Sequence, residues 1–128
     1  MPGRDLKLLA MMRNCMEMVG SRAETESLFD RIRSTVRQHL PDGAPTLDAI
    51  SATLRTTPAA IRRALADEGL GLREAIDAVR FEMARHYLPQ RHLPLTEIAL
   101  LLGYSELSAF TRAFTRWAGT SPLAYRNA

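Results

Sequence analysis

The sequence is poor in cysteine and lacks long apolar runs, and both absences narrow the class of protein. The single cysteine, Cys15, excludes an internal disulfide and fits a reducing cytoplasm. No apolar run reaches the length that crosses a membrane, and three polar residues interrupt the stretch 11–19, which argues against a secretory signal. We therefore expect one small, cytoplasmic domain, with or without an extension, and no membrane partner.

Groups of residues that carry catalysis or bind metals are also lacking. His39, His86 and His92 are scattered, without acidic or cysteine partners at ligand spacing. Neither a phosphate-binding glycine loop nor a nucleophile arrangement occurs in the sequence. The sequence therefore predicts no enzyme, no metal site and no cofactor.

Lysine is almost absent as well. Lys7 stands alone, so sixteen of the 17 basic residues are arginines. Arginine suits contacts with phosphates and with guanine, but a GC-rich genome that encodes arginine in preference to lysine explains the same bias. The formal net charge of +3 is modest, so charge alone does not decide whether the partner is a nucleic acid.

The residues that are present organise the chain around the stretch 95–126. An apolar periodic run ends at Gly103-Tyr104-Ser105, and a second apolar run follows. Two helices joined by a short glycine-containing turn are typical of a helix-turn-helix. Gly103 tolerates the positive φ of such a turn. Ala99 is small enough for the point where the helices nearly touch, and Ser105 is predicted to cap the second helix.

The second helix, expected over 106–117, has two distinct faces. Phe110, Phe114 and Trp117 recur at helical spacing and are predicted to be buried. The side chains predicted to face outward are Leu107, Ser108, Thr111 and Arg112. An outward face of serine, threonine and arginine suits base edges and phosphates. A plain helical hairpin in an all-α core shows the same periodicity.

A weaker copy of this unit occurs earlier in the chain, over about 46–70. Thr46 is expected to cap a short helix, and Thr57-Pro58 to start a second helix that Gly69 ends. An internal repeat of two such units would let one chain contact two successive major-groove segments, about 34 Å apart along one face of DNA.

The repeat can be checked residue by residue. Ile50 to Thr57 matches Ile98 to Ser105 at a constant offset of 48. One residue is then added, and Ile61 to Leu65 matches Phe110 to Phe114 at an offset of 49. Because an ordinary helical bundle has no reason to repeat a capping residue and an outward arginine in register, the repeat favours DNA binding.

Three further helices are predicted. The longest covers 72–88, between the two units, with Arg73, Asp77, Arg80, Glu82 and Arg85 among the side chains on its outer face. A helix over 24–39 precedes the first unit, with Arg31, Arg33 and Arg37 outside. A methionine-rich amphipathic helix over 1–20 either packs back on the domain or binds another subunit. We therefore expect a helical extension or linker over 1–23 and a DNA-binding domain over 24–128.

The chain resembles the AraC/XylS family of bacterial transcription regulators over about residues 24–126. The matching positions in its second half are Ile98-Ala99, Leu102-Gly103-Tyr104-Ser105, Phe110, Arg112, Phe114, Gly119, Ser121-Pro122 and Tyr125-Arg126. Arg80 and Ala84 match the family's R-x-x-x-A pattern in the helix between the units. The first unit departs from the family, because Arg55 replaces the usual turn glycine and Ala59 replaces a basic residue.

The resemblance implies an all-α fold in which two helix-turn-helix subdomains, about 46–70 and 95–118, are joined by a longer central helix. It implies a transcription regulator that binds a double-stranded DNA operator and also touches RNA polymerase. An effector-binding or dimerisation domain often accompanies this domain in the family, and these residues contain none. The chain is thus either the DNA-binding part of a longer regulator or a short regulator.

We therefore predict sequence-specific binding of double-stranded DNA, with helices 58–68 and 106–117 each in a major groove. The residues predicted to contact bases or the groove are Ala59, Arg62, Arg63, Leu107, Ser108, Thr111 and Arg112. Those predicted to contact phosphates are Thr57, Ser105 and Arg116. Arg63 and Arg112 occupy equivalent positions. Each can bind guanine, a phosphate, or an acid of the domain such as Asp67 or Glu106.

Two questions stay open at this level. Arg80 is either a structural arginine or a phosphate ligand, and the structural role is favoured. The rival function is a helical protein-interaction module that contacts RNA polymerase or another partner, with weak DNA binding that depends little on salt.

Overall fold

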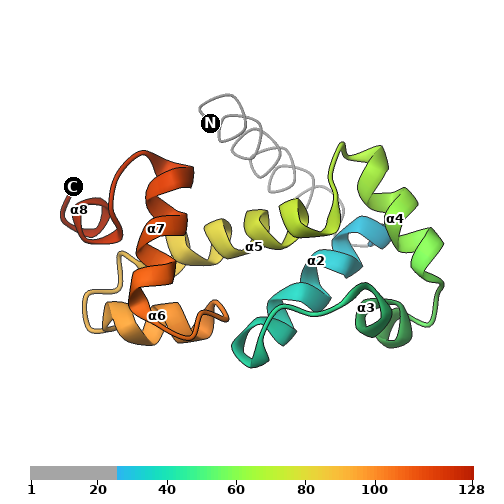
Figure 1. The fold of residues 1–128 in the computed structure, drawn as a ribbon, viewed down its shortest axis with the longest axis horizontal. Coiled ribbons are helices and arrows are strands. Elements are labelled where there is room, and N and C mark those ends of the chain that lie inside the picture. The colour runs from blue at the N-terminus through green and yellow to red at the C-terminus, as the bar shows by residue number, and fades with distance from the viewer. Residues whose placement is uncertain (1–25) are drawn as a thin grey trace.

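The computed structural model describes residues 26–128 of the chain (Figure 1). The predictions that concern the methionine-rich helix 1–20, Cys15 and the extension 1–23 lie outside these residues. The described part of the chain is all-helical, as predicted, and contains no strand. None of its helices is long and apolar enough to cross a membrane.

Two groups of short helices lie at opposite ends of one long helix. The elements in chain order are α2 (Leu28–His39), the 3-10 turn η1 (Leu40–Asp42), α3 (Leu47–Leu54), α4 (Pro58–Asp67), α5 (Leu72–Tyr87), α6 (Leu95–Leu101), α7 (Leu107–Ala118) and α8 (Pro122–Asn127). The first group, α2 to α4, and the second group, α6 to α8, are joined by α5 (Figure 1). This is the predicted arrangement of two helix-turn-helix subdomains around a central helix.

The first described helix starts later than the sequence pattern indicated. The prediction was a helix over 24–39, whereas α2 begins at Leu28. Ser27 itself has an extended conformation, and its side-chain oxygen accepts a hydrogen bond from the backbone N–H of Asp30 at 3.1 Å. A serine at the cap satisfies one of the free N–H groups of the first turn and therefore fixes the start of the helix.

The buried apolar side chains of both subdomains and of α5 belong to one core cluster. In the first subdomain Ile32, Ile50 and Ile61 are fully buried. In the second, Phe110 and Phe114 are fully buried. Phe81 of α5, which the sequence pattern did not assign to the core, packs against the aromatic side chains of α7. Its ring centroid lies 5.6 Å from that of Phe114 and 5.9 Å from that of Trp117. Buried aromatic pairs at these separations stabilise the join between α5 and α7.

Two charged side chains predicted to lie outside are in fact buried. Arg33 of α2 is 8% exposed and forms an ion pair with Glu82 of α5. Asp77 of α5 is also 8% exposed, and its carboxylate lies 3.9 Å from the guanidinium of Arg80. The prediction was wrong at both positions because a single-helix periodicity does not show an oppositely charged partner, which allows a charge to be buried.

Candidate nucleic-acid interface

Each of the two helix-turn-helix turns contains a residue with positive φ at the equivalent position. Arg55 at the end of α3 has φ 55° and ψ 48°, and Gly103 after α6 has φ 88°. Each is followed by a residue whose N–H donates back to the preceding helix, Thr56 to Ser51 O and Tyr104 to Ala99 O, both at 3.0 Å. The offset of 48 predicted from sequence is therefore a repeat of structure, and Arg55 adopts the left-handed conformation that favours glycine.

The two second helices are capped differently. Thr57 caps α4 as predicted, because its Oγ1 accepts a hydrogen bond from Ala60 N at 3.1 Å. The prediction that Ser105 caps α7 is wrong. The N-cap is Glu106, which makes no side-chain capping hydrogen bond, and Ser105 is an exposed loop residue. The residue added between the two repeats moves the start of α7 by one position, which leaves the serine outside the helix.

The outer face of α4 carries the three residues predicted for it. Ile61 and Leu65 are buried against the first subdomain. The side chains at Ala59, Arg62 and Arg63 are exposed. This face is therefore free of the core and presents two arginines and a methyl group.

The outer face of α7 is narrower than predicted. Ser108, Arg112 and Arg116 are exposed and follow one another at intervals of four residues, which places them on one stripe of the helix. Leu107 and Thr111 were predicted to face outward, but both are half-buried, and Leu107 packs against the core. They lie at the edge of the exposed stripe because α7 buries Phe110, Ala113 and Phe114 beside them.

The predicted contact residues pair across the repeat. Arg63 is the sixth residue of α4, counted from Pro58, and Arg112 is the sixth residue of α7, counted from Leu107. By the same count Ala59 pairs with Ser108 and Arg62 with Thr111. The two helices thus present the predicted contact residues at equivalent positions.

The arginines of these two faces have no acidic partner in the part of the chain that the structure describes. The ion pairs found within residues 26–128 join Arg33 and Arg37 to Glu82, and Arg80 to Asp77. The alternative of a salt bridge from Arg112 to Glu106 or from Arg63 to Asp67 is therefore not found there. Exposed, unpaired guanidinium groups remain available to an anionic or hydrogen-bonding ligand.

Arg80 has the structural role favoured from sequence. Its Nε donates to the carbonyl of Leu102 at 2.8 Å, and its guanidinium carbon lies 4.4 Å from the centre of the Tyr104 ring. These contacts hold the second turn against α5. Burial raises the pKa of the Tyr104 phenol above its ordinary value of 10.0, although the positive charge of Arg80 acts in the opposite direction.

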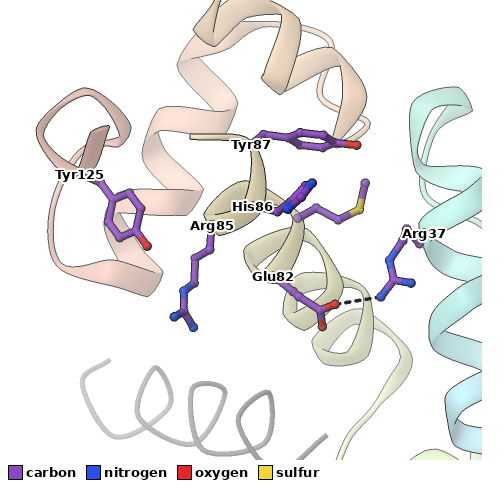
Figure 2. Close-up of a pocket in the computed structure, with 7 residues that line it drawn as sticks. Arg37, Glu82, Arg85, His86, Tyr87 and Tyr125 are labelled. Carbon is purple, nitrogen blue, oxygen red and sulfur yellow. Dashed lines mark hydrogen bonds and ion pairs between the residues drawn. The ribbon is translucent and has the colours of Figure 1, made fainter. Parts of the chain in front are cut away.

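A pocket lies away from the predicted contacts. It has a volume of about 560 Å³ and is lined by Arg37, Glu82, Met83, Arg85, His86, Tyr87 and Tyr125. Figure 2 shows Glu82 and Arg37 meeting across it, with the Tyr125 ring on the side of α8. None of the ten predicted contact residues lines this pocket. No cluster of three potential metal-binding side chains occurs among residues 26–128.

Two further exposed arginines, Arg55 and Arg73, are not among the contact residues predicted from sequence. Arg55 was noted only as the replacement of a glycine, and Arg73 only as an outer residue of the central helix. Periodicity showed that Arg73 lies outside, but not which neighbouring helix it faces.

Comparisons with known proteins place this geometry in a family. A family model described as a helix-turn-helix domain, HTH_18, matches residues 50–128. The HTH-type transcriptional regulator VirS of Mycobacterium tuberculosis is 41% identical over 100 residues, which cover 78% of this chain and 29% of VirS.

Solved structures agree with the fold. The transcriptional regulator CdpR of Pseudomonas aeruginosa is 38% identical with a TM-score of 0.65, covering 78% of this chain and 31% of CdpR. A DNA-binding transcriptional dual regulator of Escherichia coli K-12 has a TM-score of 0.73 at 18% identity, covering 81% of this chain and 93% of that one. The last match concerns the fold alone. The chain spans less than a third of the length of VirS and of CdpR.

Proposed function

Because this chain belongs to the AraC/XylS family of helix-turn-helix transcription regulators, we propose that α4 and α7 each enter a major groove of one DNA duplex. The general function follows from membership: the protein is a transcription regulator that binds double-stranded DNA in a sequence-specific manner. The proposal adds which helices and which side chains recognise the DNA.

The observation that carries the proposal is the equivalence of Arg63 and Arg112. Both are exposed, both are the sixth residue of the second helix of their unit, and neither has an acidic partner among residues 26–128. An arginine that reaches a base edge can donate two hydrogen bonds to guanine O6 and N7, which discriminates against other bases by about 1–3 kcal/mol. We assign this role to both arginines.

The other predicted contacts are assigned by their exposure and chemistry. Arg62 and Ser108 donate hydrogen bonds to base edges or phosphates, and Ala59 presents a methyl group to thymine. Leu107 and Thr111, at the edge of the α7 stripe, contribute apolar contact with a thymine methyl. Thr57, Ser105 and Arg116 contact phosphates and fix the register of the helices on the duplex.

The first unit contributes fewer base contacts than the second in this proposal. Ala59 stands where Ser108 stands in the second unit, so one hydrogen-bonding side chain is missing from α4. Arg62 and Arg63 then carry most of the specificity of the first half-site. The second half-site should therefore be the better conserved of the two.

Partners beyond DNA belong to the whole regulator. We propose contact with RNA polymerase, action in the bacterial cytoplasm and no catalytic activity, on the basis of the family alone. The accompanying effector-binding or dimerisation domain stays a prediction. The rival protein-interaction module, which contacts RNA polymerase or another partner, predicts weak DNA binding that depends little on salt. The methionine-rich helix that could serve such a partner lies outside the described residues.

The test is selection of bound duplexes from a random library by the wild-type chain and by Arg63→Ala and Arg112→Ala, with Arg91→Ala, an exposed loop variant, as control. The selected duplexes should share two conserved blocks of base sequence about one helical turn apart. Each of the two variants should blur one block, that is, weaken its base preferences. Affinity should fall steeply with salt because bound phosphates release counterions. Selection of no sequence by the folded wild-type chain, or equal blurring by Arg91→Ala, would overturn the proposal.

A further inference from the structure

A groove lies between the two subdomains, on the side of α7 that carries its arginines. It has a volume of about 430 Å³. Its lining comes from the segment before α3, from α5, from the turn between α6 and α7, and from α7 itself, namely Ala44, Leu72, Arg73, Ile76, Asp77, Arg80, Tyr104, Ala109, Arg112, Ala113 and Arg116. We call this the basic groove.

The basic groove carries a net positive charge. Among the described residues, four arginines and one aspartate line it, which gives a formal net charge of +3. Such a concentration attracts a polyanion.

The four arginines differ in what they can still bind. Arg80 is committed to the Leu102 carbonyl, the Tyr104 ring and Asp77. Asp77 is 8% exposed, and its carboxylate lies beside the guanidinium of Arg80. Arg73, Arg112 and Arg116 are exposed and make no ion pair within the described residues. Arg112 is assigned to guanine above, so Arg73 on α5 and Arg116 on α7 remain available for phosphates on two walls of the groove.

The position of the groove relates it to the path of bound DNA. One wall is α7, so a duplex that receives α7 in its major groove brings the adjacent backbone over the groove. The other wall is α5, whose first turn follows directly on α4 and carries Arg73. Arg73 in the first turn of α5 and Arg112 of the recognition helix α7 line the same groove.

We propose that the basic groove binds the sugar-phosphate backbone of the DNA segment between the two half-sites, and that Arg73 is its phosphate-binding residue on α5. This inference rests on the proposed function. It adds a third contact region, which recognises DNA by charge and spacing rather than by base sequence.

The test compares Arg73→Ala with Arg85→Ala, because both remove an exposed arginine from α5 and Arg85 lines the other pocket. Arg73→Ala should weaken binding of the selected duplex and of a random-sequence duplex by the same factor, about three- to tenfold at low salt. The slope of log affinity against log salt should become shallower by about 0.9, the value of one phosphate contact. Base preferences should not change. Arg73→Lys should keep most of the affinity, since a phosphate accepts a point charge, and Arg85→Ala should match the wild type.

A chemical change in the DNA locates the contact. A neutral methylphosphonate in the segment between the two conserved blocks should weaken binding by the wild type, but should add nothing to Arg73→Ala. The same substitution outside both blocks should affect the two proteins equally. If the central substitution weakens both proteins to the same extent, Arg73 does not bind that backbone and the inference fails.

Failure of this inference can be told apart from failure of the proposed function. If Arg112→Ala blurs its block while Arg73→Ala behaves like Arg85→Ala, only the role of Arg73 is wrong. If Arg112→Ala and Arg63→Ala leave the selected sequence unchanged, the assignment of the recognition helices is wrong. A loss confined to the selected duplex in Arg73→Ala would make Arg73 a base contact and would also overturn the inference.

Discussion

Gly103 lies directly against the backbone carbonyl of Leu40. A Cβ atom added at Gly103 would stand 2.5 Å from Leu40 O, which is closer than side-chain carbons approach an oxygen. Leu40 begins η1 in the first subdomain, and Gly103 lies in the turn of the second. The backbones of the two subdomains thus contact each other at this point. Arg80 of α5 contacts the same turn through its hydrogen bond to the Leu102 carbonyl.

The first prediction concerns this contact. Gly103→Ala should lower the free energy of unfolding by about 2–4 kcal/mol, because it combines a left-handed alanine with a clash against a backbone atom. Gly119→Ala is the matched control: its φ is 77°, but nothing lies within 4 Å of an added Cβ. That variant should lose only about 1–2 kcal/mol, the conformational cost alone. Urea denaturation measures both, and equal losses would mean that the Leu40 carbonyl moves aside freely.

A second prediction uses the other turn. Arg55 holds a left-handed conformation that costs a residue with a Cβ about 1–2 kcal/mol. Arg55→Gly should therefore raise the free energy of unfolding by about 0.5–1 kcal/mol, after the greater freedom of glycine in the unfolded chain is subtracted. Arg55→Ala keeps the conformational cost and should not stabilise the protein. A thermal melt that places Arg55→Gly below the wild type would show that the arginine side chain itself stabilises the turn.

The third prediction separates two arginines that share one carboxylate. Glu82 of α5 pairs with Arg33 and with Arg37 of α2, and the second distance is 2.8 Å. The side chain of Arg33 is 10% exposed and that of Arg37 is 43% exposed. Arg33→Ala should cost about 2–3 kcal/mol, because it removes a buried partner and its packing. Arg37→Ala should cost less than about 1 kcal/mol, since water screens the exposed pair.

High salt provides the check on this interpretation. The small effect of Arg37→Ala should disappear as ionic strength rises, whereas the effect of Arg33→Ala should largely persist. Denaturation midpoints at low and high salt give both quantities. If the two variants lose equal stability and respond equally to salt, burial does not distinguish the pairs.

Most of the helices could be predicted from sequence because their periodicity and their caps agree. Thr46 and Thr57 each accept a hydrogen bond from the backbone three residues on, as their positions indicated. The repeat at an offset of 48 was predicted from residue types, and the shared left-handed turns of Arg55 and Gly103 confirm it. Local chemistry was sufficient in these cases, since each feature depends on residues close together in the chain.

The errors come from contacts between distant segments. Arg33 is buried because Glu82, 49 residues away, lies opposite it. The exposed stripe of α7 is narrower than predicted because Leu107 packs against the core. Ser105 does not cap α7, because the second unit has one more residue than the first between the turn and the helix. The change of offset from 48 to 49 marks this added residue in the sequence, but not the position at which the helix begins. The residues proposed to contact DNA were predicted from side-chain type and position alone.

A fourth prediction concerns the attachment of α8. The Nε of Arg126 donates to Leu88 O at 2.7 Å, and its Nη2 donates to Leu93 O at 2.6 Å and to Gln90 O at 3.2 Å. One guanidinium thus satisfies three carbonyls between α5 and α6. Arg126→Ala should cost about 2–3 kcal/mol of unfolding free energy, because these carbonyls lose a charged donor. Arg126→Lys should recover only part, since an ammonium group lacks the planar fork. Arg91 lies in the loop between α5 and α6 and is exposed, so Arg91→Ala should leave the free energy of unfolding unchanged.

The last prediction concerns alkaline pH. Burial raises the pKa of Tyr104 above its ordinary value of 10.0, so the folded protein favours the neutral phenol. The stabilisation that this provides is complete below the pKa of the unfolded chain and is lost as pH rises through the pKa of the folded protein. Tyr104→Phe cannot ionise at this position. The difference in unfolding free energy between variant and wild type should therefore be constant near neutral pH and should shift in favour of the variant above about pH 10. Urea denaturation across this range tests it: parallel curves for the two proteins at all pH values would show that the phenol ionises as easily in the folded protein as in the unfolded chain.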